Sequence, residues 1–193
     1  RVVATNALRQ AKNANDFISR ANKILPKPIE IIAGREEARL IYLGVSHTNA
    51  SSDKRLVIDI GGGSTEFIIG QEFDPLLTES LQMGCVAFTQ KYFADGLITK
   101  EAFNNAISAA RKEVLAINGR YQKTGWSSVV GSSGTIKAVR NVLVSKGWAD
   151  EQERITYKGV KKLEKLLLKI GNVDDIELEG VKEHRKAVFP AGV

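Results

Sequence analysis

The stretch LVIDIGGGSTEFIIG, which runs from Leu56 to Gly70, decides how the chain is expected to fold. Two apolar runs flank the residues GGGS, so residues 55–60 and 65–71 are predicted to form the strands of a β-hairpin. Three glycines are more than a two-residue hairpin turn needs. Successive glycines free the backbone and leave the inner wall of a loop bare, so backbone N–H groups can converge on an anion. The stretch therefore favours a phosphate-binding loop over a plain turn.

The residues of this loop that are predicted to contact a phosphate are Gly61, Gly62, Gly63, Ser64 and Thr65. The serine and threonine hydroxyls would add donors to those of the backbone. No lysine follows the glycines, and the sequence after them is strand-like rather than helical. Both features exclude a Walker A loop.

One acid stands on each side of the glycines. Asp59 lies between apolar neighbours, where an unpaired charge is costly, and Glu66 opens the returning strand. In a hairpin, both side chains would project near the mouth of the loop. Two carboxylates beside a phosphate site are a usual way to hold Mg²⁺, with substrate oxygens and waters completing its shell. The alternative is that each acid pairs with a nearby arginine or lysine.

A second glycine-rich stretch, GSSGT, lies between a predicted strand and a predicted helix. It consists of Gly131, Ser132, Ser133, Gly134 and Thr135. A strand-to-helix junction of this kind presents free N–H groups at the start of the helix, where anions bind. The alternative is an ordinary serine or threonine cap.

Two charged residues near the start of the chain are further candidates for the site. On the predicted helix over 35–47, Glu37 shares a face with apolar residues, whereas Glu36 points about 100° away. An inward carboxylate near a metal and a phosphate could position or deprotonate an attacking water; the alternative is an acid that stabilises the first helical turn. Arg9 could fork onto a phosphate, or it could be an exposed helix residue.

The order of predicted elements indicates an α/β protein. The first part alternates strand and helix, which is typical of a parallel sheet, and the later part adds an antiparallel hairpin. Strands are predicted over 1–5, 29–34, 55–60, 65–71, 75–84 and 126–131, and helices over 6–25, 35–47, 85–93, 99–123, 132–147, 156–171 and, cut off in mid-course, 184–193.

Composition narrows the class of protein. The chain has 193 residues, 43% of them hydrophobic, and one cysteine, which fits a reducing cytoplasm. No apolar run approaches the roughly 20 residues of a membrane span. The chain opens on Arg1 rather than Met, with no signal peptide, which suggests an excised fragment. Residues 120–193 hold 14 basic and 9 acidic residues; this excess indicates a solvated helix face or an anionic partner. Nucleic-acid binding is not expected, because the basic segment YKGVKKLEKLLLK contains only one aromatic residue, Tyr157.

The motifs together resemble those of the Ppx/GppA phosphatase family, which comprises exopolyphosphatases and guanosine pentaphosphate phosphohydrolases. The resemblance rests on ATNALRQA, IEIIAGREEARLIYLGV, LVIDIGGGSTEFIIG, LQMGCVAFTQKYF, VVGSSGT and RKAVFPAG, in the family's order along essentially the whole chain. It implies an actin-like ATPase fold of the ribonuclease H-like, sugar kinase and heat-shock chaperone type, with a mixed β-sheet flanked by helices. Residues 1–40 would be the end of the first family domain, and 41–193 most of the second, truncated before its last strands.

The resemblance also implies roles for single residues. Glu37 corresponds to the catalytic base, Asp59 and Glu66 to Mg²⁺ ligands, Gly61 to a phosphate contact and Arg9 to a substrate-binding arginine. The GSSGT stretch corresponds to the adenosine side of related nucleotide sites. The family's first phosphate loop and a late Gly-Ala-Leu-Arg-Glu-Gly type motif are absent, so the chain alone is expected to be weakly active or inactive.

The function implied is Mg²⁺-dependent removal of the terminal phosphate of inorganic polyphosphate. The alternative is conversion of guanosine pentaphosphate (pppGpp) to the tetraphosphate (ppGpp). A non-enzymatic nucleotide or polyphosphate sensor and a kinase of the same superfold stay open. The expected setting is the cytoplasm, with peripheral membrane association as an alternative, no stable membrane insertion, no DNA partner and a homodimer of the full-length protein.

Overall fold

The computed structural model describes residues 1–193 as a mixed α/β fold. Its main sheet has the strand order β5-β4-β3-β6. The strands are β3 (Arg55–Ile60), β4 (Thr65–Gln71), β5 (Asp74–Leu81) and β6 (Ser128–Ser132). Strands β3, β4 and β5 pair antiparallel, and β6 pairs parallel with β3. The predicted hairpin and the mixed sheet flanked by helices are confirmed.

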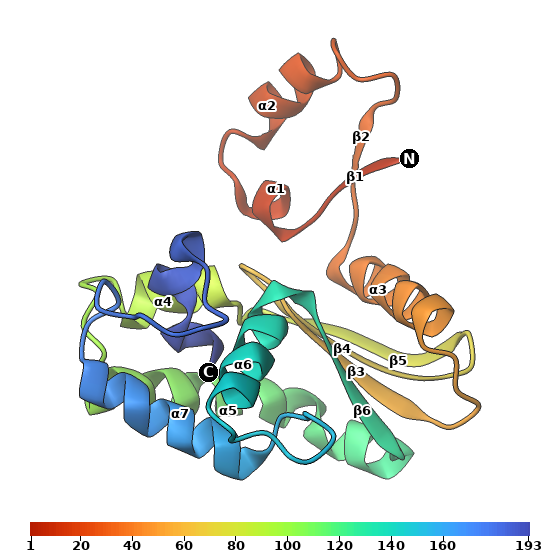
Figure 1. Cartoon of the computed structure of the whole chain (residues 1–193). Helices are drawn as coiled ribbons and strands as arrows, with labels where there is room; N and C mark the ends of the chain where they lie inside the picture. Colours follow the sequence, from red (N-terminus) through yellow and green to blue (C-terminus); the bar gives the residue numbers. More distant parts are fainter.

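The N-terminal segment stands apart from this sheet (Figure 1). Its strands β1 (Val2–Ala4) and β2 (Ile29–Ile31) pair in parallel, as the alternation of strand and helix predicted. Between them, the single helix predicted over 6–25 is wrong. The chain forms α1 (Asn6–Gln10) and α2 (Ala14–Ala21), separated by Ala11 in an extended conformation. The physical reason is the run KNAN that follows Ala11, because asparagine side chains compete with the helix for backbone hydrogen bonds.

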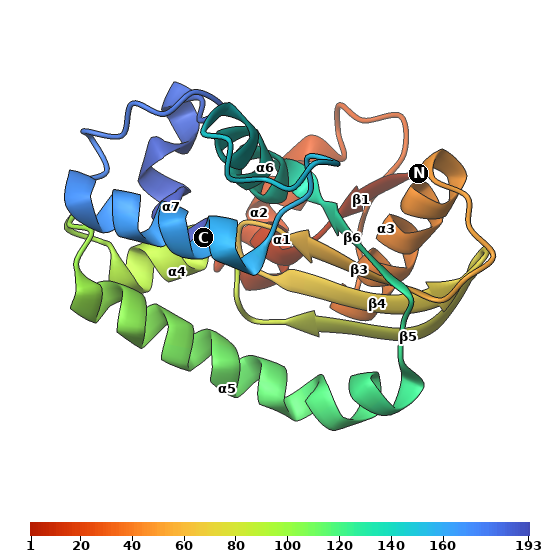
Figure 2. The same ribbon diagram turned by 60° about the horizontal axis from the view of Figure 1, so that its bottom comes forward.

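The two faces of the sheet are covered by different helices. Helix α3 (Gly34–Thr48) packs on one face, where Ala38 and Tyr42 meet Val57 and Ile68. Helix α5 (Lys100–Thr124) covers the other face, where Ile117 and Tyr121 pack against side chains of β3 and β4. These side chains alternate along the two strands with those that contact α3. Figure 2 shows α3 and α5 on opposite sides of the strands. Asp59 and Glu66 fall on the α3 face because side chains alternate along a strand.

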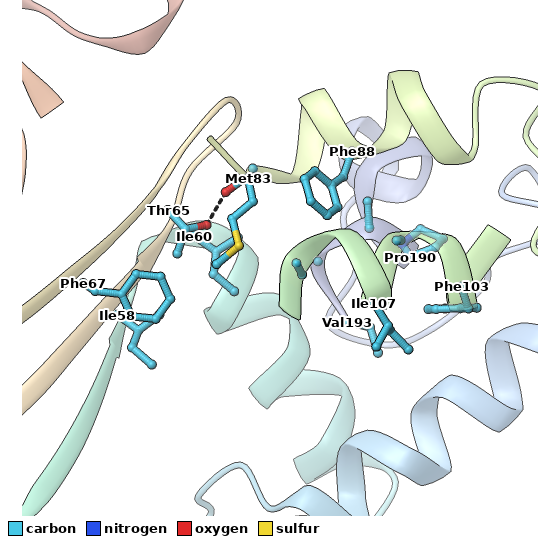
Figure 3. A pocket seen from close by; sticks show the side chains of 15 residues that line it. Ile58, Ile60, Thr65, Phe67, Met83, Phe88, Phe103, Ile107, Pro190 and Val193 are labelled. Atoms are coloured by element: carbon cyan, nitrogen blue, oxygen red, sulfur yellow. Dashed lines mark hydrogen bonds between the residues drawn. The ribbon is translucent and has the colours of Figure 1, made fainter. Parts of the chain in front are cut away.

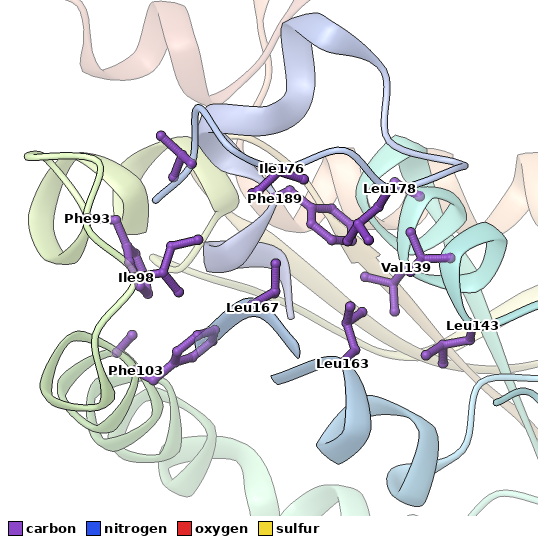
Figure 4. Packing of buried hydrophobic residues seen from close by; sticks show 14 residues of the cluster. Phe93, Ile98, Phe103, Val139, Leu143, Leu163, Leu167, Ile176, Leu178 and Phe189 are labelled. Atoms are coloured by element: carbon purple, nitrogen blue, oxygen red, sulfur yellow. The ribbon is translucent and has the colours of Figure 1, made fainter. Parts of the chain in front are cut away.

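The largest core lies beside the sheet, among helices from the second half of the chain (Figure 4). These helices are α4 (Cys85–Tyr92), α5, α6 (Ser133–Ser145) and α7 (Tyr157–Ile170). The predicted cap at Thr99 is confirmed, because its side chain accepts a hydrogen bond from the N–H of Ala102 at 3.0 Å. Gly147, with φ +62°, follows the end of α6, as predicted from the ability of glycine to adopt a left-handed conformation.

The predicted end of one strand and the predicted C-terminal helix are wrong. The third strand stops at Leu81 instead of residue 84, because the chain turns there toward α4. Residues 184–193 form the short 3₁₀ helices η1 (Glu183–Val188) and η2 (Pro190–Gly192) instead of one α-helix. Pro190 has no N–H with which to continue a helix, so the break comes just before it.

An apolar cavity of about 230 Å³ lies on the α5 face of the sheet, below the glycine loop (Figure 3). Side chains such as Ile58, Phe67 and Phe103 line it. The sheet therefore separates this cavity from Asp59 and Glu66.

No helix in the structure combines the length and the apolar character that crossing a membrane requires.

Candidate functional site

The glycine loop is shaped by the start of helix α4. The N–H of Cys85 donates to the carbonyl of Gly61 at 2.9 Å, and the N–H groups of Val86 and Ala87 donate to the carbonyl of Gly62 at 2.8 and 3.0 Å. Within the loop, the N–H of Gly61 donates to the carbonyl of Ser64 at 3.0 Å. The carbonyls of Gly61 and Gly62 are thus bonded to α4.

Unlike these carbonyls, three successive N–H groups of the loop form no hydrogen bond within the chain. Those of Gly62, Gly63 and Ser64 have no backbone acceptor and no side-chain acceptor in the chain. Backbone N–H groups are obligatory donors, so three successive free ones form the kind of concavity that binds an anion. The hydroxyl of Thr65 is used elsewhere: it donates to the carbonyl of Met83 on the α5 face (Figure 3), so it is not a free donor at the loop.

The loop is in close contact with its surroundings at two glycines. A Cβ on Gly84 would lie 2.5 Å from the carbonyl carbon and oxygen of Gly62 and 2.6 Å from the nitrogen of Gly63. A Cβ on Gly63 would lie 2.0 Å from Oδ1 of Asn6. The loop is therefore held between α4 below and the N-terminal segment above.

Asp59 and Glu66 face each other across the hairpin at the base of the loop. They are direct partners in the β3–β4 register, which places their side chains on the same face, with Cβ atoms about 5 Å apart. Glu66 is 1% exposed and accepts a hydrogen bond from the hydroxyl of Ser80 at 2.8 Å. Neither acid forms a salt bridge. The alternative in which each acid pairs with an arginine or lysine is therefore wrong.

The pKa of both carboxyls is raised above its ordinary value. Burial is the main cause at Asp59 and at Glu66, and the negative charge of Glu37 adds to the rise in pKa at both. The hydroxyls of Ser132 and Ser133 beside Asp59, and of Ser64 and Ser80 beside Glu66, offset part of it. The loop thus adjoins two carboxyls, Asp59 and Glu66, that no cation of the chain pairs with.

Glu37 lies inward in the first turn of α3, as predicted. Its Oε2 accepts a hydrogen bond from Nη2 of Arg9 at 3.0 Å, and both side chains are less than one-fifth exposed. Nη1 of the same arginine donates to the carbonyl of Ile32 at 2.6 Å. Glu36 instead pairs with Arg39 on the outer side of the helix. Arg9 therefore fixes the Glu37 carboxylate beside the other two acids.

The GSSGT stretch lies next to Asp59. Ser132 is the register partner of Asp59 in the β3–β6 pair, and its side chain makes no capping bond to α6, which removes the interpretation as an ordinary cap. Thr135 donates to Sγ of Cys85 at 3.5 Å. The cysteine thus contacts both glycine-rich stretches, because its own N–H donates to Gly61.

The model of the Ppx/GppA phosphatase family matches residues 1–193. The chain belongs to the Ppx/GppA phosphatase family. A solved family member from Aquifex aeolicus superposes with a TM-score of 0.75 at 28% identity, covering 98% of this chain and 62% of that one. A structure from Cytophaga hutchinsonii has a TM-score of 0.81 at 22% identity, covering 98% of this chain and 63% of that one, and supports the fold.

Curated relatives of this Ppx/GppA chain share one name. A protein of Photobacterium profundum named guanosine-5'-triphosphate,3'-diphosphate pyrophosphatase is 42% identical over 193 residues, which are 100% of this chain and 38% of the relative. A Vibrio cholerae protein of the same name has the same identity and coverage. The chain therefore spans 38% of the length of these relatives.

Sequence reasoning missed four residues at the site of this Ppx/GppA chain. Ser80 holds Glu66, Gly84 seats the loop on α4, Asn6 covers Gly63, and Arg185 places its guanidinium where a Cβ on Gly134 would lie. For Gly84 the signal was a glycine just before a predicted helix. Ser80 reaches Glu66 through the pairing of β4 with β5. Asn6 and Arg185 lie on segments far from the loop in sequence, so only the tertiary structure brings them to the site.

Replacing Glu66 by glutamine is expected to raise the melting temperature of the metal-free chain at pH 8. The pKa of Glu66 is raised by burial, so the native state holds this proton more tightly than the unfolded state does, and stability falls as pH rises through the raised pKa. Glutamine removes the charge and keeps an acceptor for Ser80. In a chain of this size, each kcal/mol recovered raises the melting temperature by about 2–4 °C.

Thermal unfolding at pH 8 and at lower pH checks this expectation. The gain should shrink as pH approaches the pKa of an unfolded-state glutamate, about 4.3, because the carboxyl is then increasingly protonated in both states. The control variant is Glu151→Gln, which removes the same negative charge from an exposed position. A lower melting temperature for Glu66→Gln, or an equal gain in both variants, would show that burial of this charge does not cost stability.

Proposed function

We propose that this chain carries the phosphoanhydride-hydrolase site of a protein that removes the terminal 5′ phosphate of guanosine pentaphosphate. The observation that carries the proposal is the set of three free N–H groups beside the half-buried Asp59, the buried Glu66 and the fixed Glu37. The shared name of the curated relatives favours the guanosine nucleotide over inorganic polyphosphate, which the sequence alone had placed first.

The chain's own groups supply positioning and charge stabilisation. The N–H groups of Gly62, Gly63 and Ser64 would bind the oxygens of the terminal phosphoryl group, whose charge is spread over those oxygens in the transition state. Glu37 would orient a water for in-line attack and accept its proton. Arg9 holds the Glu37 carboxylate in place. No covalent nucleophile is needed for this reaction.

The two acids at the base of the loop fit a divalent cation such as Mg²⁺. Asp59 is half-buried and Glu66 is buried, the two lie opposite each other in the β3–β4 pair, and neither has a cationic partner. Mg²⁺ in phosphate sites uses one or two carboxylates with substrate oxygens and waters. The chain has no cluster of three or more potential metal ligands, which a site of this kind does not require. When bound, the ion would neutralise charge on the phosphate oxygens.

Inorganic polyphosphate remains the second candidate substrate. It ends in the same phosphoanhydride, and the basic residues of 120–193, with 14 basic against 9 acidic side chains, favour a polyanion over a small nucleotide. For either substrate, we propose a cytoplasmic location and a homodimer of the full-length protein.

The test uses the complete gene product that contains these residues. Phosphate release would be followed with Mg²⁺ from guanosine pentaphosphate and from long-chain polyphosphate, each supplied at equal concentrations of terminal phosphate. A higher kcat/KM for the nucleotide is expected. Preference for polyphosphate would move the assignment to an exopolyphosphatase. Binding of either compound without phosphate release would indicate a sensor, and transfer from ATP to an acceptor a kinase.

A further inference from the structure

The side chain of Asn6 lies directly over the glycine loop, although it comes from the N-terminal segment. It is the first residue of α1. A Cβ on Gly63 would stand 2.0 Å from its Oδ1 and 2.8 Å from its Cγ. The amide therefore occupies the place that a side chain at position 63 would take, next to the free N–H groups of the loop.

The amide of Asn6 makes no hydrogen bond in the chain. Its Nδ2 is buried and has no acceptor. Buried polar side-chain atoms nearly always have a partner, and exceptions are explained by strain, by function or by an absent water or ion. Here the exception lies beside three backbone donors that also lack acceptors. Donors that gather without acceptors indicate that the acceptor is a ligand.

Asn6 is also tied to the catalytic side of the site. Arg9 stands three residues later on α1, so the two side chains lie on the same side of the helix. Arg9 contacts Glu37 at 3.0 Å, while Asn6 contacts the loop at Gly63. One short helix thus touches both the phosphate-binding loop and the acid that would position water.

We propose that the Asn6 amide is a direct phosphate ligand, which adds a side-chain donor to the three backbone donors of the loop. Rotation about the Cβ–Cγ bond by half a turn exchanges Nδ2 and Oδ1 and brings the NH₂ group over Gly63. This torsion is broad in asparagine, and neither end of the amide gives up a hydrogen bond in turning. A bound phosphoryl oxygen then joins the N-terminal segment to the sheet.

The inference rests on the proposed function, because it assumes that the loop binds phosphate. It goes further by assigning a binding residue outside the hairpin. It also gives a reason for glycine at position 63, since any side chain there would occupy the space of the amide. A purely structural role for Asn6 makes a different prediction, because a packing residue depends on its shape and not on its donors.

Asn6→Asp separates the two roles, because aspartate keeps the shape of asparagine, loses the NH₂ donors and adds negative charge. Binding of inorganic triphosphate in the presence of Mg²⁺ would be measured by calorimetry on the complete gene product. We expect affinity to fall about 10- to 100-fold, as for the loss of a hydrogen bond to a charged group. Asn15→Asp, at an exposed position near the start of α2, makes the same charge change and should leave affinity within about twofold of wild type.

Asn6→Ser keeps a donor in a smaller side chain and is expected to bind with intermediate affinity and an unchanged melting temperature. Equal affinities of Asn6→Asp and wild type, or equal losses in Asn6→Asp and Asn15→Asp, would overturn the inference. If wild type releases phosphate from guanosine pentaphosphate while Asn6→Asp binds triphosphate normally, only this inference fails. If wild type neither binds triphosphate nor releases phosphate, the proposed function fails and the inference fails with it.

Discussion

Replacing Glu37 by glutamine is expected to lower phosphate release from guanosine pentaphosphate by about 10²- to 10⁴-fold, the contribution of a positioned general base. Glutamine keeps the size of the side chain and an oxygen that can accept from Arg9, but it cannot take a proton from water. Binding to the loop does not depend on this carboxylate. We therefore expect the loss in kcat, with KM changed little, and the measurement is steady-state phosphate release.

The matched control is the neighbouring Glu36→Gln. Glu36 lies in the same helical turn and pairs with Arg39 on the outer side of α3, so its loss should change kcat less than about twofold, as for an exposed ion pair. Activity retained in Glu37→Gln would remove this residue from the reaction. A loss of folding, seen as a lower melting temperature in Glu37→Gln alone, would instead indicate that the Arg9–Glu37 pair is structural.

Replacing Gly84 by alanine is expected to have the second largest effect, because its Cβ would collide with the backbone of the loop. The atoms it would meet at 2.5 to 2.6 Å belong to Gly62 and Gly63, and backbone atoms cannot turn aside as a flexible side chain can. The loop must shift, and a displacement of about 1 Å in a catalytic site can cost about 10²-fold in rate. Overpacking should also destabilise the fold by about 1–3 kcal/mol.

Triphosphate binding, phosphate release and urea unfolding would be measured together for Gly84→Ala. The control is Gly119→Ala in α5, where an added Cβ meets nothing within 4 Å, so this change should stabilise its helix by about 0.5–1 kcal/mol. Gly84→Ala with wild-type binding and turnover would mean that contact with α4 does not set the shape of the loop.

Much of the hairpin could be predicted from the sequence because its signals are local. The alternation of apolar and polar residues defines β3 and β4, and the glycines mark the turn between them. Because side chains alternate across a strand, the same pattern places Asp59 and Glu66 on one face. The inward position of Glu37 also followed from helical periodicity, and the structure agrees with both expectations.

The remaining features depend on contacts between segments distant in sequence. That the loop carbonyls are bonded to α4, so that its N–H groups are free, follows from tertiary packing at Gly84 and not from the glycines themselves. The same holds for Asn6, which approaches Gly63 from another part of the chain. The break in the helix predicted over 6–25 shows the limit of periodicity, because apolar spacing continued through a segment whose asparagines favour a turn.

The central claim is that a water molecule attacks the terminal 5′ phosphorus of the nucleotide at this site. The most direct test is hydrolysis of guanosine pentaphosphate by the complete gene product in water enriched in oxygen-18, followed by mass spectrometry of both products after a single turnover. The account predicts one heavy oxygen in the released inorganic phosphate and none in guanosine tetraphosphate. Heavy oxygen in the nucleotide product, or release of pyrophosphate, would contradict it.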